Sequence, residues 1–323
     1  MLRTSLAAFV TASILSILPA PSSAQEVTLN ALNFLPNNSG MGTTFAEWVD
    51  DVNKAGKGLV QIQIKPAGSI SPFQMANAVK TGVVDMGAIP PAFYQNLLPI
   101  ADALKLARKS PEEMRKNGTW AFMNKLHNEK VNAWLLNTTA YSVRFYLYLR
   151  DKKIETPNLA GLKLRTTPVY RAFFRALGAD LIQTAPGDVF IALERGTIDG
   201  YGWVSWDLKT PGWDKHTKYR VEPGFYAVVL GTIVNLDKWN SLSPKQREFL
   251  TEQSIKFELE WDKRYAPRTE AYLKEQTDAG IQVIELKGSV AENYVKTAND
   301  TAWAEFTELD PVNAPQLKKL IFD

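Results

Sequence analysis

The sequence predicts an α/β fold with about two domains. Its 323 residues are 45% hydrophobic and 22% charged, a globular composition with enough chain for two cores. Segments with strand and helix patterns alternate along the chain. A unit of helix, glycine, strand and aspartate also occurs twice, over 75–87 and 189–200. The repeat suggests two related α/β domains, although such joints are common enough that coincidence is an alternative here.

Hydrophobic periodicity gives the expected elements in order. Alternating or continuous apolar runs predict strands at 27–31, 60–64, 83–87, 131–136, 143–149, 162–165, 228–234 and 281–284. Helical spacing and start signals predict helices that open at Pro72 and Pro168 and others near 45–52, 189–195, 243–276 and 290–306. Residues 37–40 form a turn that also offers a helix cap. Pro267 should kink or break the long helix. Because no linker separates two halves, we expect interleaved domains.

Composition excludes several function classes. With 37 Lys and Arg against 34 Asp and Glu and no dense basic run, nucleic acid is not an expected partner. The absence of cysteine excludes disulfides, thiolate metal sites and a cysteine nucleophile. The two histidines, His127 and His216, are too few for a three-histidine site in one chain, and we expect both to be solvated. No P-loop, G-x-S-x-G, H-E-x-x-H or G-x-G-x-x-G motif is present.

The N-terminus indicates export. Arg3 is followed by an apolar run over 6–18 and then by Ser22-Ser23-Ala24, which predicts a signal peptide cleaved after Ala24. The run is shorter than the ~20 residues of a membrane span. A buried N-terminal helix or an uncleaved anchor is the alternative.

Two arginines are candidate anion anchors. Arg165 ends a predicted strand, and the carboxyl ends of strands face the ligand crevice in α/β folds. Arg144 lies within a strand beside aromatic residues. A guanidinium matches a carboxylate with two parallel hydrogen bonds. An ion pair with a surface acid is the ordinary alternative for either residue.

Aromatic residues suggest the wall of a small-molecule site. The candidates are Trp203, Trp206, Phe225 and Tyr226, to which we add Asn38 in the turn after the first strand. Ordinary core packing is the alternative for most of the nine tryptophans.

Three segments together resemble one family. Leu159-Ala160-Gly161-Leu162-Lys163-Leu164-Arg165 is similar to its L-x-G-L-K-[IL]-R motif, 190–200 to its A-L-Q-x-G-x-x-D-G motif, and 78–87 to its x-V-x-x-G-x-x-D-M-G motif. The family is that of the DctP-type solute-binding proteins of TRAP (tripartite ATP-independent periplasmic) transporters.

The resemblance implies a periplasmic-binding-protein-like clamshell with crossing strands and one long domain-spanning helix. Domain I is then expected over 25–141 plus 229–268, and domain II over 142–228 plus 269–323. It further implies that Arg165 is the main carboxylate anchor, that Arg144 is a second arginine, and that Trp203 lines the pocket. Sialic-acid-binding members have Asn where this chain has Trp203, which argues against that ligand. We predict no cofactor and leave a ligand-bridging metal ion open.

The expected function is a periplasmic receptor that binds a small organic acid and delivers it to TRAP membrane permease subunits. A monocarboxylate is the preferred ligand, such as a 2-oxo acid or an acid with an apolar or aromatic tail. The alternatives are a ligand-sensing receptor for a membrane signalling protein, a binding protein of an ATP-driven importer, and an exported α/β enzyme.

Overall fold

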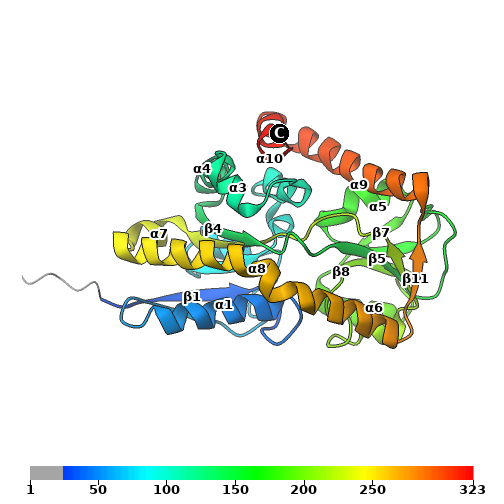
Figure 1. Cartoon of the computed structure of the whole chain (residues 1–323), viewed down its shortest axis with the longest axis horizontal. Coiled ribbons are helices and arrows are strands. Elements are labelled where there is room, and N and C mark those ends of the chain that lie inside the picture. The colour runs from blue at the N-terminus through cyan, green and yellow to red at the C-terminus, as the bar shows by residue number, and fades with distance from the viewer. Residues whose placement is uncertain (1–24, 323) are drawn as a thin grey trace, which may run out of the picture.

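Two separate β-sheets organise the chain, in agreement with the predicted two-lobed α/β fold. The structure is a computed structural model that describes residues 25–322, so the predicted signal peptide (1–24) lies outside the described residues. Figure 1 shows the sheet with β1 and β4 at one end of the long axis and the sheet with β5, β8 and β11 at the other. Within 25–322, no helix is both long and apolar enough to cross a membrane.

The first sheet has the order β2-β1-β3-β10-β4. Its strands are β1 (Val27–Asn33), β2 (Val60–Ile64), β3 (Met86–Ile89), β4 (Ala133–Thr139) and β10 (Leu230–Asn235). β1 pairs in parallel with β2 and β3, whereas β10 pairs antiparallel with β3 and β4. The helix α1 (Gly42–Ala55) begins after the predicted turn, without a side-chain cap, and buries the predicted Phe45, Trp48, Val49 and Val52 face.

The second sheet has the order β11-β9-β5-β8-β6-β7. Its strands are β5 (Phe145–Leu149), β6 (Lys163–Thr166), β7 (Asp180–Gln183), β8 (Gly200–Val204), β9 (Tyr219–Glu222) and β11 (Gln282–Glu285). β7 and β9 were not predicted, because each has four residues and no clear alternation in the sequence. Of β8 only the first residue falls within the prediction, at the end of the repeated unit over 189–200.

Shorter helices complete both lobes. These are α2 (Met75–Lys80), α3 (Pro111–Lys116), α4 (Thr119–Val131), α5 (Arg171–Ala176), α6 (Val189–Glu194), α7 (Leu236–Ser241), α9 (Gly288–Leu309) and α10 (Ala314–Phe322), with 3-10 helices η1 (Pro91–Tyr94), η2 (Pro99–Leu106), η3 (Pro168–Tyr170), η4 (Pro186–Asp188) and η5 (Trp213–His216). The helix predicted to open at Pro72 begins at Met75, after a turn. The one predicted to open at Pro168 is η3 followed by α5.

The chain crosses between the sheets, as expected from the missing linker. It leaves the first sheet between β4 and β5 and returns between β9 and β10. It crosses again through α8 (Pro244–Asp278). Near the start of this helix Gln246 donates to the carbonyl of Leu59 in the first lobe, and near its end Gln276 donates to the carbonyl of Ser205 in the second lobe. The interleaved topology is confirmed, while the exact domain boundaries stay a prediction. Of the kink or break predicted at Pro267, the break does not occur, because α8 continues through this residue. Figure 1 shows a change of direction near the middle of the helix.

The repeated sequence unit has the same geometry twice. Asp85 donates its backbone N–H to the carbonyl of Asn30, and its carboxylate accepts the N–H of Asn30 at 2.7 Å. Asp199 does the same with Lys163, whose N–H reaches the carboxylate at 2.8 Å. Each preceding helix is followed, after one capping residue, by a glycine in the left-handed region, with φ of 73° at Gly82 and 66° at Gly196. The two lobes therefore share one local design for starting a parallel strand.

His127 is fully buried on α4, so the prediction of a solvated histidine is wrong there. Its Nδ1 lies 2.7 Å from the carbonyl of Met123 and therefore carries the proton, and its Nε2 accepts the Tyr94 hydroxyl at 3.0 Å. The sequence did not reveal this, because the neighbouring Lys125, Glu129 and Lys130 are exposed while His127 faces the core.

Candidate functional site

Two of the cavities that lie where the lobes meet are largely apolar. The smaller, about 40 Å³, is here the Phe93 cavity and is lined by Phe34, Leu35, Met41, Pro90, Phe93, Asp102, Lys105, Phe145, Thr167, Val169, Tyr170, Trp203, Val204 and Ala227–Leu230. The larger, about 230 Å³, is here the Trp206 cavity and is lined by Leu35, Pro36, Asn38–Met41, Pro186, Gly187, Trp203, Val204, Trp206, Asp207, Thr210, Pro211 and Trp213. Both cavities take residues from both lobes and share the side chain of Trp203.

Arg165 lies on β6 and is fully buried. Its Nε and Nη2 donate to the carbonyl of Thr184 at 3.2 and 3.0 Å, and its Nη1 donates to the Tyr170 hydroxyl at 2.7 Å. Every one of these acceptors is neutral, and within 25–322 no carboxylate lies at ion-pair distance from Arg165. Burial lowers the pKa of Arg165, but a guanidinium stays charged in proteins. The result is a buried cation without a counter-ion.

The Arg165 guanidinium lies behind side chains that line the cavities. It does not itself line either of them, but its Cζ lies 5.7 Å from the centre of the Trp203 ring. Tyr170, its hydroxyl partner, lines the Phe93 cavity. Trp203 and Tyr170 therefore separate Arg165 from the space between the lobes.

Arg144 does not join Arg165. It lies just before β5, where its backbone forms a bridge with Ala227, and its side chain is exposed. It lines a surface groove beside α9 rather than either cavity. The sequence predicted a strand over 143–149, but β5 begins at Phe145. Arg144 therefore lies on the connection between the two sheets.

Three predicted residues do reach the Trp206 cavity. Trp203 packs edge-on against Trp213, with ring centres 4.7 Å apart. Trp206 is fully buried, and its Nε1 donates to the Thr269 hydroxyl at 2.8 Å. Asn38 is exposed at the rim. These residues came from both lobes, so the sequence patterns identified two sides of one site.

Phe225 and Tyr226 lie elsewhere. They pack in an aromatic core with Phe173 and Tyr294, and the Tyr226 hydroxyl donates to the carbonyl of Ala298 on α9 at 2.6 Å. Neither lines a cavity at the lobe junction. The residues just after them, 227–230, line the Phe93 cavity instead.

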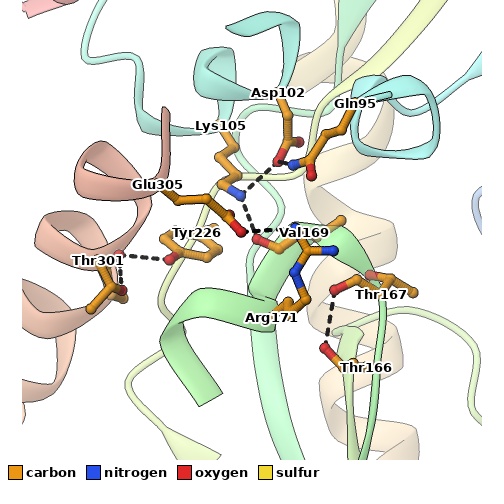
Figure 2. A network of polar contacts seen from close by, with 11 residues as sticks. Gln95, Asp102, Lys105, Thr166, Thr167, Val169, Arg171, Tyr226, Thr301 and Glu305 are labelled. Carbon is orange, nitrogen blue, oxygen red and sulfur yellow. Dashed lines mark hydrogen bonds and ion pairs between the residues drawn. The ribbon is translucent and has the colours of Figure 1, made fainter. Parts of the chain in front are cut away.

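A buried ion pair at the Phe93 cavity was not predicted. Lys105 donates to the carboxylate of Asp102 at 2.6 Å and also to the carbonyl of Val169 on the other lobe, and Gln95 donates to Asp102 at 3.0 Å (Figure 2). Burial raises the pKa of Asp102, while Lys105 and Gln95 act in the opposite direction. The available signal was the placement of two charged residues, three apart, within the otherwise apolar segment Pro99–Leu106.

Thr167 and Tyr170 were also missed. The Thr167 hydroxyl is buried and has no hydrogen-bond partner, and the residue lines the Phe93 cavity. Its place directly after the strand that carries Arg165 was the signal, since ligands bind at the carboxyl ends of such strands. This hydroxyl is available to a bound molecule.

A hydrogen bond joins the two lobes beside each cavity. Asp207, after β8, accepts the backbone N–H of Gly40, after β1, at 2.7 Å. At the Phe93 cavity the bond from Lys105 to Val169 plays the same bridging role. Within residues 25–322, no group of three or more His, Asp or Glu side chains is arranged to hold a metal ion.

Comparisons with known proteins identify the family of this chain. The model of the DctP family, bacterial extracellular solute-binding proteins, family 7, matches residues 33–309. The chain is 24% identical over 205 residues to a monocarboxylate 2-oxoacid-binding periplasmic protein of Nostoc sp. (strain PCC 7120), covering 60% of this chain and 56% of that protein. It is 25% identical over 184 residues to a solute-binding protein of Roseobacter denitrificans, with 55% and 56% covered. The chain thus spans little more than half the length of these curated relatives.

Solved structures share the fold. A TRAP transporter solute-binding protein from Bordetella bronchiseptica, described with copurified calcium and picolinate, superposes with a TM-score of 0.80 at 21% identity over 92% of each chain. A TRAP solute-binding protein from Desulfovibrio salexigens with bound orotic acid gives 0.81 at 17% identity over 91% and 97% of the chains. At these identities the likeness establishes the two-lobed fold.

Proposed function

Because this chain belongs to the DctP family of bacterial extracellular solute-binding proteins, we propose that it is the periplasmic receptor of a TRAP transporter for a monocarboxylate with an apolar tail. One observation carries the proposal: Arg165 is a buried guanidinium without a counter-ion, directly behind two largely apolar cavities. The proposed role is capture and delivery without chemical change, as for a substrate-binding receptor.

A ligand carboxylate would supply the missing counter-ion. An unpaired buried charge is costly, and each charge-assisted hydrogen bond contributes roughly 1.5–3 kcal/mol. To reach Arg165, the carboxylate has to take the place of the Tyr170 hydroxyl at Nη1, so Tyr170 has to shift when the ligand binds. The free Thr167 hydroxyl is then placed to donate to an oxygen of the ligand, such as the second carboxylate oxygen or a neighbouring oxo group.

The rest of the ligand would be apolar. Aromatic and aliphatic side chains dominate both cavities, which favours an apolar or aromatic tail. The charged groups on the walls are the Lys105–Asp102 pair and Asp207, so a second carboxylate would meet no unpaired cation there. The acids named for relatives, 2-oxo acids, picolinate and orotate, are small carboxylates of this general kind.

Binding would be coupled to closure of the lobes. A ligand that touches Trp203 on one lobe and Met41 on the other binds the closed form best and shifts the population toward it. The Gly40–Asp207 and Lys105–Val169 bonds form only when the lobes meet, and so add to the same preference. The membrane subunits would then receive the closed, loaded protein.

A thermal-shift screen tests this proposal. Pyruvate, phenylpyruvate, benzoate and succinate are compared, with isothermal calorimetry on any acid that raises the Tm. At 100 times its Kd a ligand stabilises by about 2.7 kcal/mol, which corresponds to a Tm rise of about 5 °C for a chain of this size. We expect phenylpyruvate or benzoate to exceed succinate and to be recovered unchanged. A response to succinate alone, or turnover of the acids, would contradict the proposal.

A further inference from the structure

A surface groove beside α9 is separate from the two cavities. It has a volume of about 880 Å³ and lies between the connections that join the sheets and the helices α9 and α10. Figure 1 shows α9 and α10 together along one side of the molecule. We call it the α9 groove; its walls include Arg108, Arg144, Phe225, Trp303, Lys318 and Phe322.

The α9 groove has an excess of positive charge. Arg108, Arg144 and Lys318 are exposed, and none of them forms an ion pair with any residue of 25–322. The acids on the same walls are Glu292 and Asp300, and Asp300 is already paired with Lys296. Concave surfaces of one sign concentrate the opposite charge.

Aromatic rings lie beside two of the three cations. The Arg108 guanidinium lies 4.7 Å from the centre of the Phe322 ring, and the Lys318 ammonium lies 5.3 Å from that of Trp303. The indole N–H of Trp303 is buried without an acceptor. The groove therefore offers cations, a spare donor and apolar surface, a combination that fits an acidic segment with apolar side chains.

The groove also depends on how the lobes are oriented. Arg144 lies on the connection from β4 to β5 and Phe225 on the connection from β9 to β10, the two segments that cross between the sheets. Lys105 lines both this groove and the Phe93 cavity. A partner bound in the groove would thus contact the segments that must bend when the lobes open or close.

We propose that the α9 groove is the docking surface for an acidic segment of the TRAP membrane subunits. By binding this groove, the subunits distinguish the closed receptor from the open one. This inference rests on the proposed function. The partner is a carboxylate-rich, partly apolar peptide segment. Arg108, Arg144 and Lys318 would bind its carboxylates, and the aromatic rings of the groove would contact its apolar side chains.

Charge reversal in the groove tests the proposal. The double variant Arg108→Glu/Lys318→Glu is compared with the control Lys57→Glu/Lys125→Glu, which reverses two exposed lysines outside the groove. Binding to the membrane subunits in nanodiscs is measured at low and high salt, with empty nanodiscs of the same anionic lipid beside them. We expect the groove variant to lose at least ~10-fold in affinity at low salt, with the control unchanged.

Two outcomes would overturn the inference. One is wild-type affinity of the groove variant for the subunits. The other is an equal loss on empty nanodiscs, which would make the groove a lipid-binding surface. The thermal-shift response to phenylpyruvate is recorded for every variant. A groove variant that keeps this thermal-shift response but loses binding to the subunits supports docking in the groove. A wild-type protein that shows no response to any acid contradicts the proposed ligand, whereas the docking proposal is still decided by the affinities for the subunits.

Discussion

The carboxylate of Asp207 accepts a 2.7 Å hydrogen bond from the backbone N–H of Gly40, and this bond joins the two lobes at the wall of the Trp206 cavity. A Cβ atom added at Gly40 would lie 2.7 Å from the Cβ of Asp207, closer than real Cβ atoms approach. The absence of a side chain at Gly40 thus permits the lobes to close this far.

We predict that Gly40→Ala keeps the lobes from closing fully. The affinity for the preferred acid should fall by about tenfold, because the closed form carries the binding contacts. Gly187→Ala is the matched control, since Gly187 lines the same cavity and a Cβ there meets no atom within 4 Å. Calorimetry gives the affinities, and small-angle scattering should show a larger radius of gyration for Gly40→Ala alone. Equal affinities for the two variants would refute the latch.

Trp203 should determine the preference for aromatic tails. Because it lines both cavities, Trp203→Leu is expected to weaken phenylpyruvate binding by about tenfold and pyruvate binding by much less. Trp134→Leu serves as the control, because Trp134 stacks on Trp239 in the first lobe and lines neither cavity. The ratio of the two dissociation constants, measured by calorimetry, decides the point; an unchanged ratio would remove Trp203 from the site.

His127 should make the protein less stable in acid. Burial lowers its pKa to about 4, whereas an unfolded histidine titrates near 6.5. Between these values only the unfolded chain takes up the proton, so the free energy of unfolding falls as the pH drops from about 6.5 toward 4. For this group the loss is about 2 kcal/mol at pH 5 relative to pH 7.

The His127→Gln variant isolates this effect. Other titrating groups cancel when the difference in unfolding free energy between pH 7 and pH 5 is compared with that of the wild type. Urea unfolding at both pH values should give a smaller difference for the variant, even if the variant is less stable overall. The same pH dependence in both proteins would contradict the assignment.

The sequence predicted the architecture better than the site. Apolar patterns identified the first-lobe strands. The long helix was identified by its start signal at Ser243 and Pro244 and by a charged stretch without glycine. The repeated glycine and aspartate unit was informative for a physical reason: Asp85 and Asp199 each tie a strand start to its neighbour, by one backbone–backbone bond and one bond from the neighbour's N–H to the carboxylate. β7 and β9 were too short to leave such a pattern.

Site residues were found only where a local pattern marked them. Trp203 and Arg165 lie at or beside strand ends, where the chain direction itself points to the crevice. Lys105 meets the carbonyl of Val169 only in the folded protein, over a sequence separation that no local pattern records. Phe225 and Tyr226 show the reverse error, since aromatic character alone does not distinguish a pocket wall from the core.

The affinity of Arg165→Met for phenylpyruvate, measured by calorimetry beside the wild type, tests the central claim most directly. Arg171→Met is the control, because that guanidinium is bound to Glu305 at 2.8 Å and lines neither cavity. If Arg165 provides the counter-charge for the ligand carboxylate, its loss should weaken binding by more than ~10-fold while the protein stays folded and Arg171→Met binds normally. Wild-type affinity in a folded Arg165→Met protein would contradict the account.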